Sequence, residues 1–275
     1  MIDRRDEEMS IKLIAMDLDG TLLNSKKLIS KRNMEAIAAA KKAGVYVTLA
    51  TGRMYSAAAY FARQIEANAP VVCCNGSMVR AVGAKKSVFE KLYDDDVAKA
   101  VLTECYENGW YAQWYVGEEI YAEAFRRELF DSYKTVKDFT IREVGKNFLP
   151  YVHDVVQIVV RDGEGRVPEI AAYLAKKYKD GLSAQQNTGY SVDLTPPGIT
   201  KAVGMEALRM HLGLKTEEIM VCGDADNDLA MLAYAGLSIV PENGTAEAKE
   251  LADFITASCD EDGIGKAIEK YVLEV

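Results

Sequence analysis

The feature of this sequence that most constrains its fold is a regular alternation of short apolar runs and helix-forming segments at both ends of the chain. Near the N-terminus, apolar runs at residues 12–16, 45–50 and 70–76 are separated by segments with helical composition. The same alternation returns after Lys201 and continues to the C-terminus. Strands that alternate with helices predict a parallel sheet, so we expect a doubly wound α/β domain built from both ends of the chain.

The middle of the chain has a different pattern. It is typical of a hairpin around Gly83, followed by strands at 110–116, 154–160 and 190–194 and by helices at 94–108 and 167–177. Such a change between two halves of one repeating pattern predicts an inserted α+β domain. We therefore assign residues 1–83 and 197–275 to the α/β core domain and residues 84–196 to the insertion.

Composition and charge narrow the classes of protein that this chain can be. Of its 275 residues, 49% are hydrophobic and 27% are charged, which is ordinary for a globular protein. No apolar run approaches the ~20 residues that cross a bilayer. The charged stretch at residues 1–10 lacks the apolar segment of a secretory signal, and we expect it to be a flexible lead-in. The formal net charge of −9 disfavours nucleic acid and anionic membranes as partners.

Cysteine and histidine chemistry is disfavoured by the positions of these residues. The five cysteines are odd in number and form no C-x-x-C pair, so we expect neither a zinc site nor a disulfide framework, but buried thiols in a reducing cytoplasm. Cys222 fits a small buried strand residue, because no glycine-rich phosphate loop closing on an arginine accompanies it. The only histidines, His153 and His211, lie apart from every polar motif, which argues against a histidine phosphatase or a zinc hydrolase.

Polar motifs follow predicted strands or begin a predicted helix at four places. The strand at 12–16 runs into Asp17-Leu18-Asp19-Gly20-Thr21, and the strand at 45–50 into Thr51-Gly52-Arg53. Lys201 begins a helix, and residues 223–228 read Gly-Asp-Ala-Asp-Asn-Asp after another strand. In open parallel sheets, ligands bind outside the carboxyl ends of the strands, so we expect these motifs to form one site. The acidic run at 223–228 is not a calcium loop, because Leu229 and Ala235 replace the required Gly and Glu.

Together, these four stretches resemble the sequence motifs of the haloacid dehalogenase superfamily of aspartate-nucleophile phosphatases. Residues 17–21 match its first motif, 51–53 its second, Lys201 its third and 223–228 its fourth. The order and surroundings are most similar to the Cof-like subgroup, which carries an α+β cap of type IIB between the second and third motifs. One departure is the stretch VPENGT at 240–245, where the subgroup usually has a smaller turn that ends in Asn-Ala.

The resemblance implies a role for each matching residue. Asp17 would be the nucleophile and Asp19 the general acid and base, while Asp17, the backbone carbonyl of Asp19 and Asp224 would bind Mg²⁺. Phosphate contacts would come from the N–H of Leu18 and from Thr51, Gly52, Lys201 and Asn227, with supporting roles for Thr21, Arg53 and Asp228. The residue chemistry permits these roles: a carboxylate with a pKa near ~3.9 needs no base to be a nucleophile, and oxygen ligands suit Mg²⁺.

The implied function is Mg²⁺-dependent hydrolysis of a phosphate monoester of a small metabolite, such as a sugar phosphate or a nucleotide, through an aspartyl-phosphate. Two alternatives stay open from the sequence. A phosphomutase would use a similar aspartate and cap but would transfer the phosphoryl group to a second hydroxyl. A catalytically weak protein on the same fold would bind a metabolite and regulate another process.

The aromatic strand at 110–116 allows one further expectation about specificity. Alternation places Trp110, Trp114 and their neighbours at even positions on one face of the strand, which is the better core face. Tyr111 and Gln113 lie on the other face. We expect these two side chains to face the substrate.

Overall fold

The computed structural model describes residues 10–126, 129, 141–188 and 191–274. For residues 186–188 it describes the backbone but not the side chains. Residues 1–9 of the predicted N-terminal lead-in (1–10) lie outside the described residues, as does Tyr190, the expected start of a strand. The chain forms two compact units. Unit 1 comprises Met1–Leu49, Ile65–Ala69 and Arg209–Val275, and unit 2 comprises Ala50–Gln64 and Pro70–Leu208.

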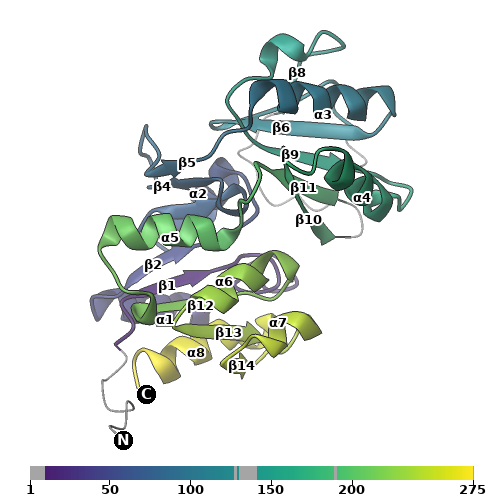
Figure 1. Cartoon of the computed structure of the whole chain (residues 1–275). Coiled ribbons are helices and arrows are strands. Elements are labelled where there is room, and N and C mark those ends of the chain that lie inside the picture. Colours follow the sequence, from purple (N-terminus) through teal and green to yellow (C-terminus); the bar gives the residue numbers. More distant parts are fainter. Residues whose placement is uncertain (1–9, 127–128, 130–140, 189–190, 275) are drawn as a thin grey trace, which may run out of the picture. The chain divides into compact units, whose positions relative to one another are not determined.

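Unit 1 is built on a parallel sheet with the strand order β14-β13-β12-β1-β2 (Figure 1). Its strands are β1 Leu13–Met16, β2 Tyr46–Leu49, β12 Ile219–Cys222, β13 Leu237–Pro241 and β14 Phe254–Thr256. Every neighbouring pair is parallel. The central strands β1 and β12 are buried along their whole length, as continuous apolar runs predict. The predicted parallel α/β core is confirmed.

Helices connect these strands and cover the sheet on both faces. They are α1 Lys31–Lys42, α6 Leu229–Tyr234, α7 Ala246–Glu250 and α8 Gly263–Tyr271. The connection through α1 moves to one side of β1, whereas those through α6 and α7 move to the other side. Because such crossovers are right-handed, the two sets lie on opposite faces. Helix α8 packs beside α1, where the N–H of Gly265 donates to Asn33 Oδ1 at 2.8 Å.

Unit 2 contains a larger sheet, here called the mixed sheet, with the strand order β10-β11-β9-β6-β7-β8. Its strands are β6 Tyr111–Val116, β7 Glu119–Ala122, β8 Ile141–Glu143, β9 Val155–Arg161, β10 Ser183–Thr188 and β11 Ser191–Thr195. Its neighbouring strands are antiparallel except for β7 and β8. Helices α3 Asp95–Glu107 and α4 Val167–Lys177 pack on one face of this sheet, around a core that includes Trp114.

Three strands of the mixed sheet escape sequence-based prediction for physical reasons. Strand β7 follows β6 after only two residues, and β8 has only three residues. Strand β10 reads SAQQNT, so it shows no alternation of apolar and polar side chains. Its partner β11 supplies the apolar side chains Val192 and Leu194 that mark the core face.

The rest of unit 2 lies outside the mixed sheet. It contains α2 Tyr55–Gln64, the strands β3 Val71–Cys73, β4 Met78–Arg80 and β5 Phe89–Glu90, and most of α5 Lys201–Leu212. Strands β4 and β5 form the predicted hairpin, and β3 pairs with β4. The predicted insertion, residues 84–196, lies within unit 2, which extends beyond it at both ends. Its limits stay a prediction.

Among the described residues, no helix combines the length and hydropathy that a membrane crossing needs.

The two tryptophans provide a matched test of the core of unit 2. Trp114 is 1% exposed, and its Nε1 donates to the carbonyl of Tyr151 at 3.0 Å, whereas Trp110 is only partly buried beside Tyr173. We expect Trp114→Ala to lower the free energy of unfolding by about 3–5 kcal/mol, because it leaves a cavity and an unpaired carbonyl. Trp110→Ala should cost less than half as much. Urea unfolding followed by circular dichroism measures both, and equal losses would contradict this description of the core.

Candidate active site

Three carboxylates meet at the carboxyl ends of neighbouring strands in unit 1. Asp17 directly follows β1, and its N–H donates to the carbonyl of Cys222 at the end of β12, at 2.9 Å. Asp224 comes two residues after β12. Carboxylate oxygens of Asp17, Asp224 and Asp228 all lie within 4.8 Å of one another, and Asp17 and Asp228 are buried. The sheet therefore brings part of the first predicted motif against the fourth.

The turn after β12 holds two of these carboxylates in place. Asp228 Oδ2 accepts hydrogen bonds from the N–H groups of Asp224, at 2.9 Å, and Ala225, at 3.1 Å. Thr21 Oγ1 donates to Asp224 Oδ1 at 2.5 Å. Gly20 has φ = +85°, and a Cβ there would overlap the Asp224 carboxylate. Glycine at position 20 thus allows the first motif to approach Asp224.

The donor set fits a small divalent cation. Three like charges in partly buried surroundings repel one another, and a cation between them would offset that repulsion. The ligands are all oxygens, which hard cations such as Mg²⁺ and Ca²⁺ prefer. Asp226, in the same turn, is exposed and is not part of the cluster. Thiol chemistry is not favoured at this place, since burial, and secondly the charge of Asp228, raise the pKa of the neighbouring Cys222 thiol.

Asp19 has a partner that the sequence analysis did not identify. Lys27 Nζ lies 2.8 Å from Asp19 Oδ1, in an ion pair with both side chains partly exposed. Lys27 has φ = +59°, so the chain turns back sharply toward Asp19 at this point. A lysine eight residues downstream in a loop gives no periodic signal, and only the folded loop reveals the pair.

The departure at 240–245 still connects to the first and fourth motifs. Asn243 Nδ2 donates to the carbonyl of Gly20 at 2.7 Å, and its Oδ1 accepts from the N–H of Cys259 at 2.8 Å. The N–H of Thr245 donates to the carbonyl of Asp224 at 2.8 Å. The asparagine in this loop therefore links the Asp-containing turn at residues 17–21 to the C-terminal segment.

In unit 2, hydrogen bonds fold the Thr51-Gly52-Arg53 motif onto the turn that follows β3. The N–H of Thr51 donates to the carbonyl of Val72 at 2.9 Å, and the N–H of Asn75 donates to the carbonyl of Thr51 at 3.2 Å. Thr51 Oγ1 accepts from the N–H of Arg53 at 3.2 Å. The Arg53 guanidinium is buried and lies 5.2 Å from the centre of the Phe61 ring. These contacts hold the motif as a compact loop.

Polar residues of the mixed sheet contact this loop directly. Gln157 Nε2 donates to the carbonyl of Gly52 at 3.4 Å, and Asn75 Nδ2 donates to Asp193 Oδ2 at 2.7 Å. A Cβ at Gly52 would lie 2.9 Å from Asn75 Oδ1 and 3.2 Å from Asp193 Oδ2, so these side chains crowd the loop. Sequence analysis did not single out Gln157 or Asp193. The polar positions Ser191, Asp193 and Thr195 alternate along β11, which was the available signal.

Lys201 is fully buried at the first position of α5. Helix α5 lies close to the turn after β3, because a Cβ at Gly204 would be 2.5 Å from Val72 Cγ1 and 2.9 Å from Gly76 Cα. The absence of side chains at Gly76 and Gly204 thus permits the contact that positions Lys201 in unit 2. Burying an ammonium group is costly unless it is paired, so its position calls for anionic neighbours.

The remaining predicted residues have defined places within each unit. Leu18 is buried next to Asp17, and Asn227 is half-buried in the short turn Asp226–Asp228. Tyr111 and Gln113 are 4% and 1% exposed and lie on the face of β6 away from α3 and α4. The alternation expected for this strand is confirmed, while contact of these two side chains with a substrate stays a prediction.

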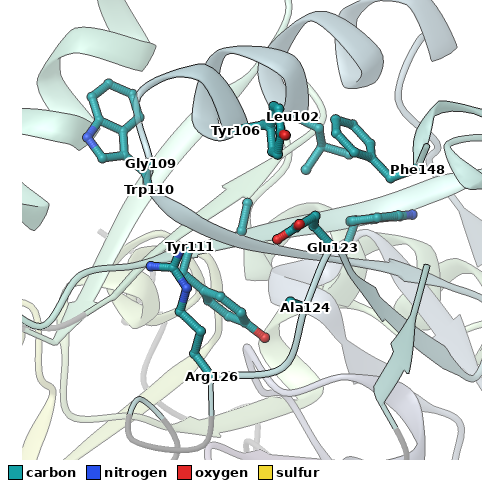
Figure 2. Close-up of a pocket in the computed structure, with 11 residues that line it drawn as sticks. Leu102, Tyr106, Gly109, Trp110, Tyr111, Glu123, Ala124, Arg126 and Phe148 are labelled. Atoms are coloured by element: carbon teal, nitrogen blue, oxygen red, sulfur yellow. The ribbon is translucent and has the colours of Figure 1, made fainter. Parts of the chain in front are cut away.

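One pocket of about 90 Å³ lies between α3 and β6 and is distinct from these motifs (Figure 2). Its lining includes Leu102, Tyr106, Trp110 and Phe148, and Figure 2 shows Arg126 alongside the Tyr111 ring. Apart from Tyr111, it contains no predicted site residue. We assign this pocket no role.

Comparisons with known proteins show which proteins this chain is similar to. The model of the haloacid dehalogenase-like hydrolase family matches residues 14–268. A 5-amino-6-(5-phospho-D-ribitylamino)uracil phosphatase of Bacillus subtilis (strain 168) is 29% identical over 265 residues, covering 94% of this chain and 97% of that protein. A phosphoglycolate phosphatase of Methanothermobacter thermautotrophicus is 25% identical, covering 95% of this chain and 98% of that protein. The crystal structure of a haloacid dehalogenase-like hydrolase from Bacteroides thetaiotaomicron superposes with a TM-score of 0.86 at 29% identity, covering 95% of this chain and 99% of that one.

The carboxylate cluster predicts a measurable cation site. Asp224→Asn should weaken the binding of Mg²⁺ at least about tenfold, because it removes one of few anionic ligands. Asp226→Asn is a matched control from the same turn and should leave the affinity unchanged. Isothermal titration calorimetry on the purified chain measures both affinities, and equal losses in the two variants would show that the cation binds elsewhere.

Proposed function

The chain belongs to the family of haloacid dehalogenase-like hydrolases, and on that premise we propose that it is a Mg²⁺-dependent phosphatase. It hydrolyses phosphate monoesters of small metabolites, such as sugar phosphates or nucleotides, through an aspartyl-phosphate on Asp17. The observation that carries the proposal is the cluster of Asp17, Asp224 and Asp228 at the ends of β1 and β12. A set of oxygen ligands beside a candidate nucleophile is what phosphoryl transfer assisted by a metal requires.

Asp17 and Asp19 divide the chemistry between them. In the first step, a carboxylate oxygen of Asp17 forms a bond to phosphorus, the ester P–O bond breaks, and Asp19 gives its proton to the leaving oxygen. In the second step, Asp19 takes a proton from a water molecule, which attacks phosphorus. The P–O bond to Asp17 then breaks, which releases phosphate and restores the free carboxylate of Asp17.

Neutral and cationic donors hold the phosphoryl group during both steps. We assign this role to the N–H of Leu18, the hydroxyl of Thr51, the N–H of Gly52, the ammonium of Lys201 and the amide of Asn227. Supporting residues keep other groups in place: Thr21 holds Asp224, Asp228 binds the N–H groups of the turn, and Arg53 stiffens the loop. Lys201 suits this role because its ammonium, at the first position of α5, can make charge-assisted hydrogen bonds to phosphate oxygens.

Asp17, the backbone carbonyl of Asp19 and Asp224 would hold the Mg²⁺. When bound, the cation neutralises charge on the phosphate and on Asp17, so that two anions can approach each other. Asp228 belongs to the same carboxylate cluster, and it orients the turn that carries Asp224 by accepting a hydrogen bond from the N–H of Asp224.

We propose that residues 84–196 form a cap that selects the substrate, with Tyr111 and Gln113 among its contacts. The relatives' names describe substrates with very different leaving groups, a ribitylamino-uracil and glycolate. The cap, and not the carboxylate cluster, would make that distinction. The five cysteines are buried free thiols, which supports a cytoplasmic location, and the partner is a small phosphorylated metabolite.

Release of inorganic phosphate from p-nitrophenyl phosphate tests the proposed function. Activity should vanish in EDTA and return with Mg²⁺ better than with Ca²⁺, because calcium takes more ligands at longer distances. Full activity in EDTA would refute the metal requirement. Transfer of the phosphoryl group to a sugar without phosphate release would indicate a phosphomutase, and equally negligible turnover by wild type and Asp17→Asn would indicate a binding protein.

The two aspartates should respond differently to the same substitution. Asp17→Asn should abolish turnover, because an amide is a poor nucleophile and a poor metal ligand. Asp19→Asn keeps the nucleophile and the backbone carbonyl, so it should slow turnover by about 10²–10⁴-fold, the usual contribution of general acid–base catalysis. Steady-state phosphate release measures both variants. Near-normal release by Asp17→Asn would mean that water attacks phosphorus directly.

A further inference from the structure

Outside the four motifs, the mixed sheet carries buried hydrogen-bond acceptors that no described residue satisfies. The side-chain carbonyl oxygens of Gln113 on β6, Gln157 on β9 and Gln185 on β10 are buried and have no hydrogen-bond partner among the described residues. The side chains of Gln113 and Gln157 are 1% and 0% exposed. Buried polar atoms in folded proteins are almost always paired, so three such oxygens in one region call for an explanation.

Strand register places the three glutamines on one face of the sheet. Gln113 is opposite Val159, Val159 is opposite Asp193, and Asp193 is opposite Gln185, so these residues form a row across four adjacent strands. Gln157 precedes Val159 by two residues and therefore points to the same side. The other side carries Trp114, Ile158 and Leu194 and packs under the helices.

The amide groups are oriented so that their oxygens face away from the protein's own donors. Gln157 Nε2 donates to the carbonyl of Gly52 at 3.4 Å, and Gln185 Nε2 donates to the carbonyl of Ile199 at 3.2 Å. A backbone carbonyl can only accept, so neither amide can turn around without losing its partner. Gln113 Nε2 donates to Tyr115 Oη at 2.8 Å, and because a hydroxyl can also donate, this amide is not fixed in the same way. The Oε1 atoms of Gln157 and Gln185 are thus left to accept a hydrogen bond from something else, and Gln113 Oε1 lies on the same face without a partner among the described residues.

We infer that Gln113, Gln157 and Gln185 are specificity-determining residues that accept hydrogen bonds from hydroxyl groups of the leaving group. The inference rests on the proposed phosphatase function, because Gln157 contacts Gly52 of the loop assigned to phosphate. A substrate held by that loop would extend its alcohol part along the polar face of the mixed sheet. Hydroxyl groups at successive carbons would then supply donors to the row of carbonyl oxygens.

The charges of this face point to a neutral leaving group. In the central strands β6, β9 and β11, its charged residues are Arg161 and Asp193, which have opposite signs. Three carbonyl oxygens repel an added carboxylate, since they are acceptors with partial negative charge. We therefore expect polyhydroxylated alcohols to be preferred over glycolate, whose carboxylate offers no donor.

A pair of substrates that differ only in hydroxyl groups tests the inference. D-Ribitol 5-phosphate and n-pentyl phosphate have the same carbon chain, and phosphoglycolate adds a carboxylate. The wild-type enzyme should show a kcat/KM for ribitol phosphate at least about tenfold above both, because sites built to bind hydroxyl groups reject analogues that lack them. Gln157→Met and Gln113→Met keep the length of the side chain and should bring the ratio of ribitol to pentyl phosphate toward one.

A matched control and two distinct failures complete the test. Gln64→Met changes an exposed glutamine at the end of α2 and should leave the substrate ratio unchanged. Equal kcat/KM for ribitol and pentyl phosphate in a wild-type enzyme that hydrolyses both would overturn the inference but leave the phosphatase function standing. If no phosphate ester is hydrolysed, the proposed function fails, and calorimetric binding of D-ribitol 5-phosphate to wild type and Gln157→Met decides the inference. Equal affinities would then reject it.

Discussion

The crowding of carboxylates at the end of a buried strand is the constraint on which the rest of unit 1 depends. Two like charges 4 Å apart repel by roughly 4 kcal/mol at the effective dielectric of a protein surface, and three of them lie within 4.8 Å here. Hydrogen bonds offset part of this repulsion: two backbone N–H groups donate to Asp228, and the hydroxyl of Thr21 donates to Asp224. Such fixed negative charge favours a bound cation, and a cation in turn permits an anionic nucleophile to meet phosphate.

The two faces of the mixed sheet in unit 2 differ, and we propose that one face stabilises the fold while the other recognises the substrate. Trp114 and its apolar neighbours on one face pack under α3 and α4. On the other face, Gln157 and Asp193 contact the loop at Gly52 and the turn at Asn75. A strand has a period of two, so alternate residues of β6, β9 and β11 form the two faces. We therefore expect substitutions on the polar face to change substrate preference while leaving the apolar core intact.

Sequence predicts this protein unevenly, and the reasons are physical. The strands of unit 1 are continuous apolar runs between helices, so both their existence and their parallel pairing follow from the pattern. The Asp17 and Asp224 motifs stand at strand ends, where a ligand site is expected. In contrast, β10 has no alternation of apolar and polar side chains that would predict a strand. The ion pair of Lys27 with Asp19 and the hydrogen bond from Asn243 to the carbonyl of Gly20 depend on how loops fold. The row of Gln113, Val159, Asp193 and Gln185, which places the glutamines on one face, exists only through cross-strand register.

The central claim is that Asp17 itself becomes phosphorylated. Acid quenching of the wild-type enzyme during turnover of p-nitrophenyl phosphate with Mg²⁺, followed by peptide mass spectrometry, tests it most directly. The account predicts a phosphoryl group on Asp17 that hydroxylamine removes, as expected of an acyl phosphate, and none in the Asp17→Asn variant. Phosphate release without any phosphorylated peptide at the earliest times, or a phosphoryl group on another residue, would contradict the account.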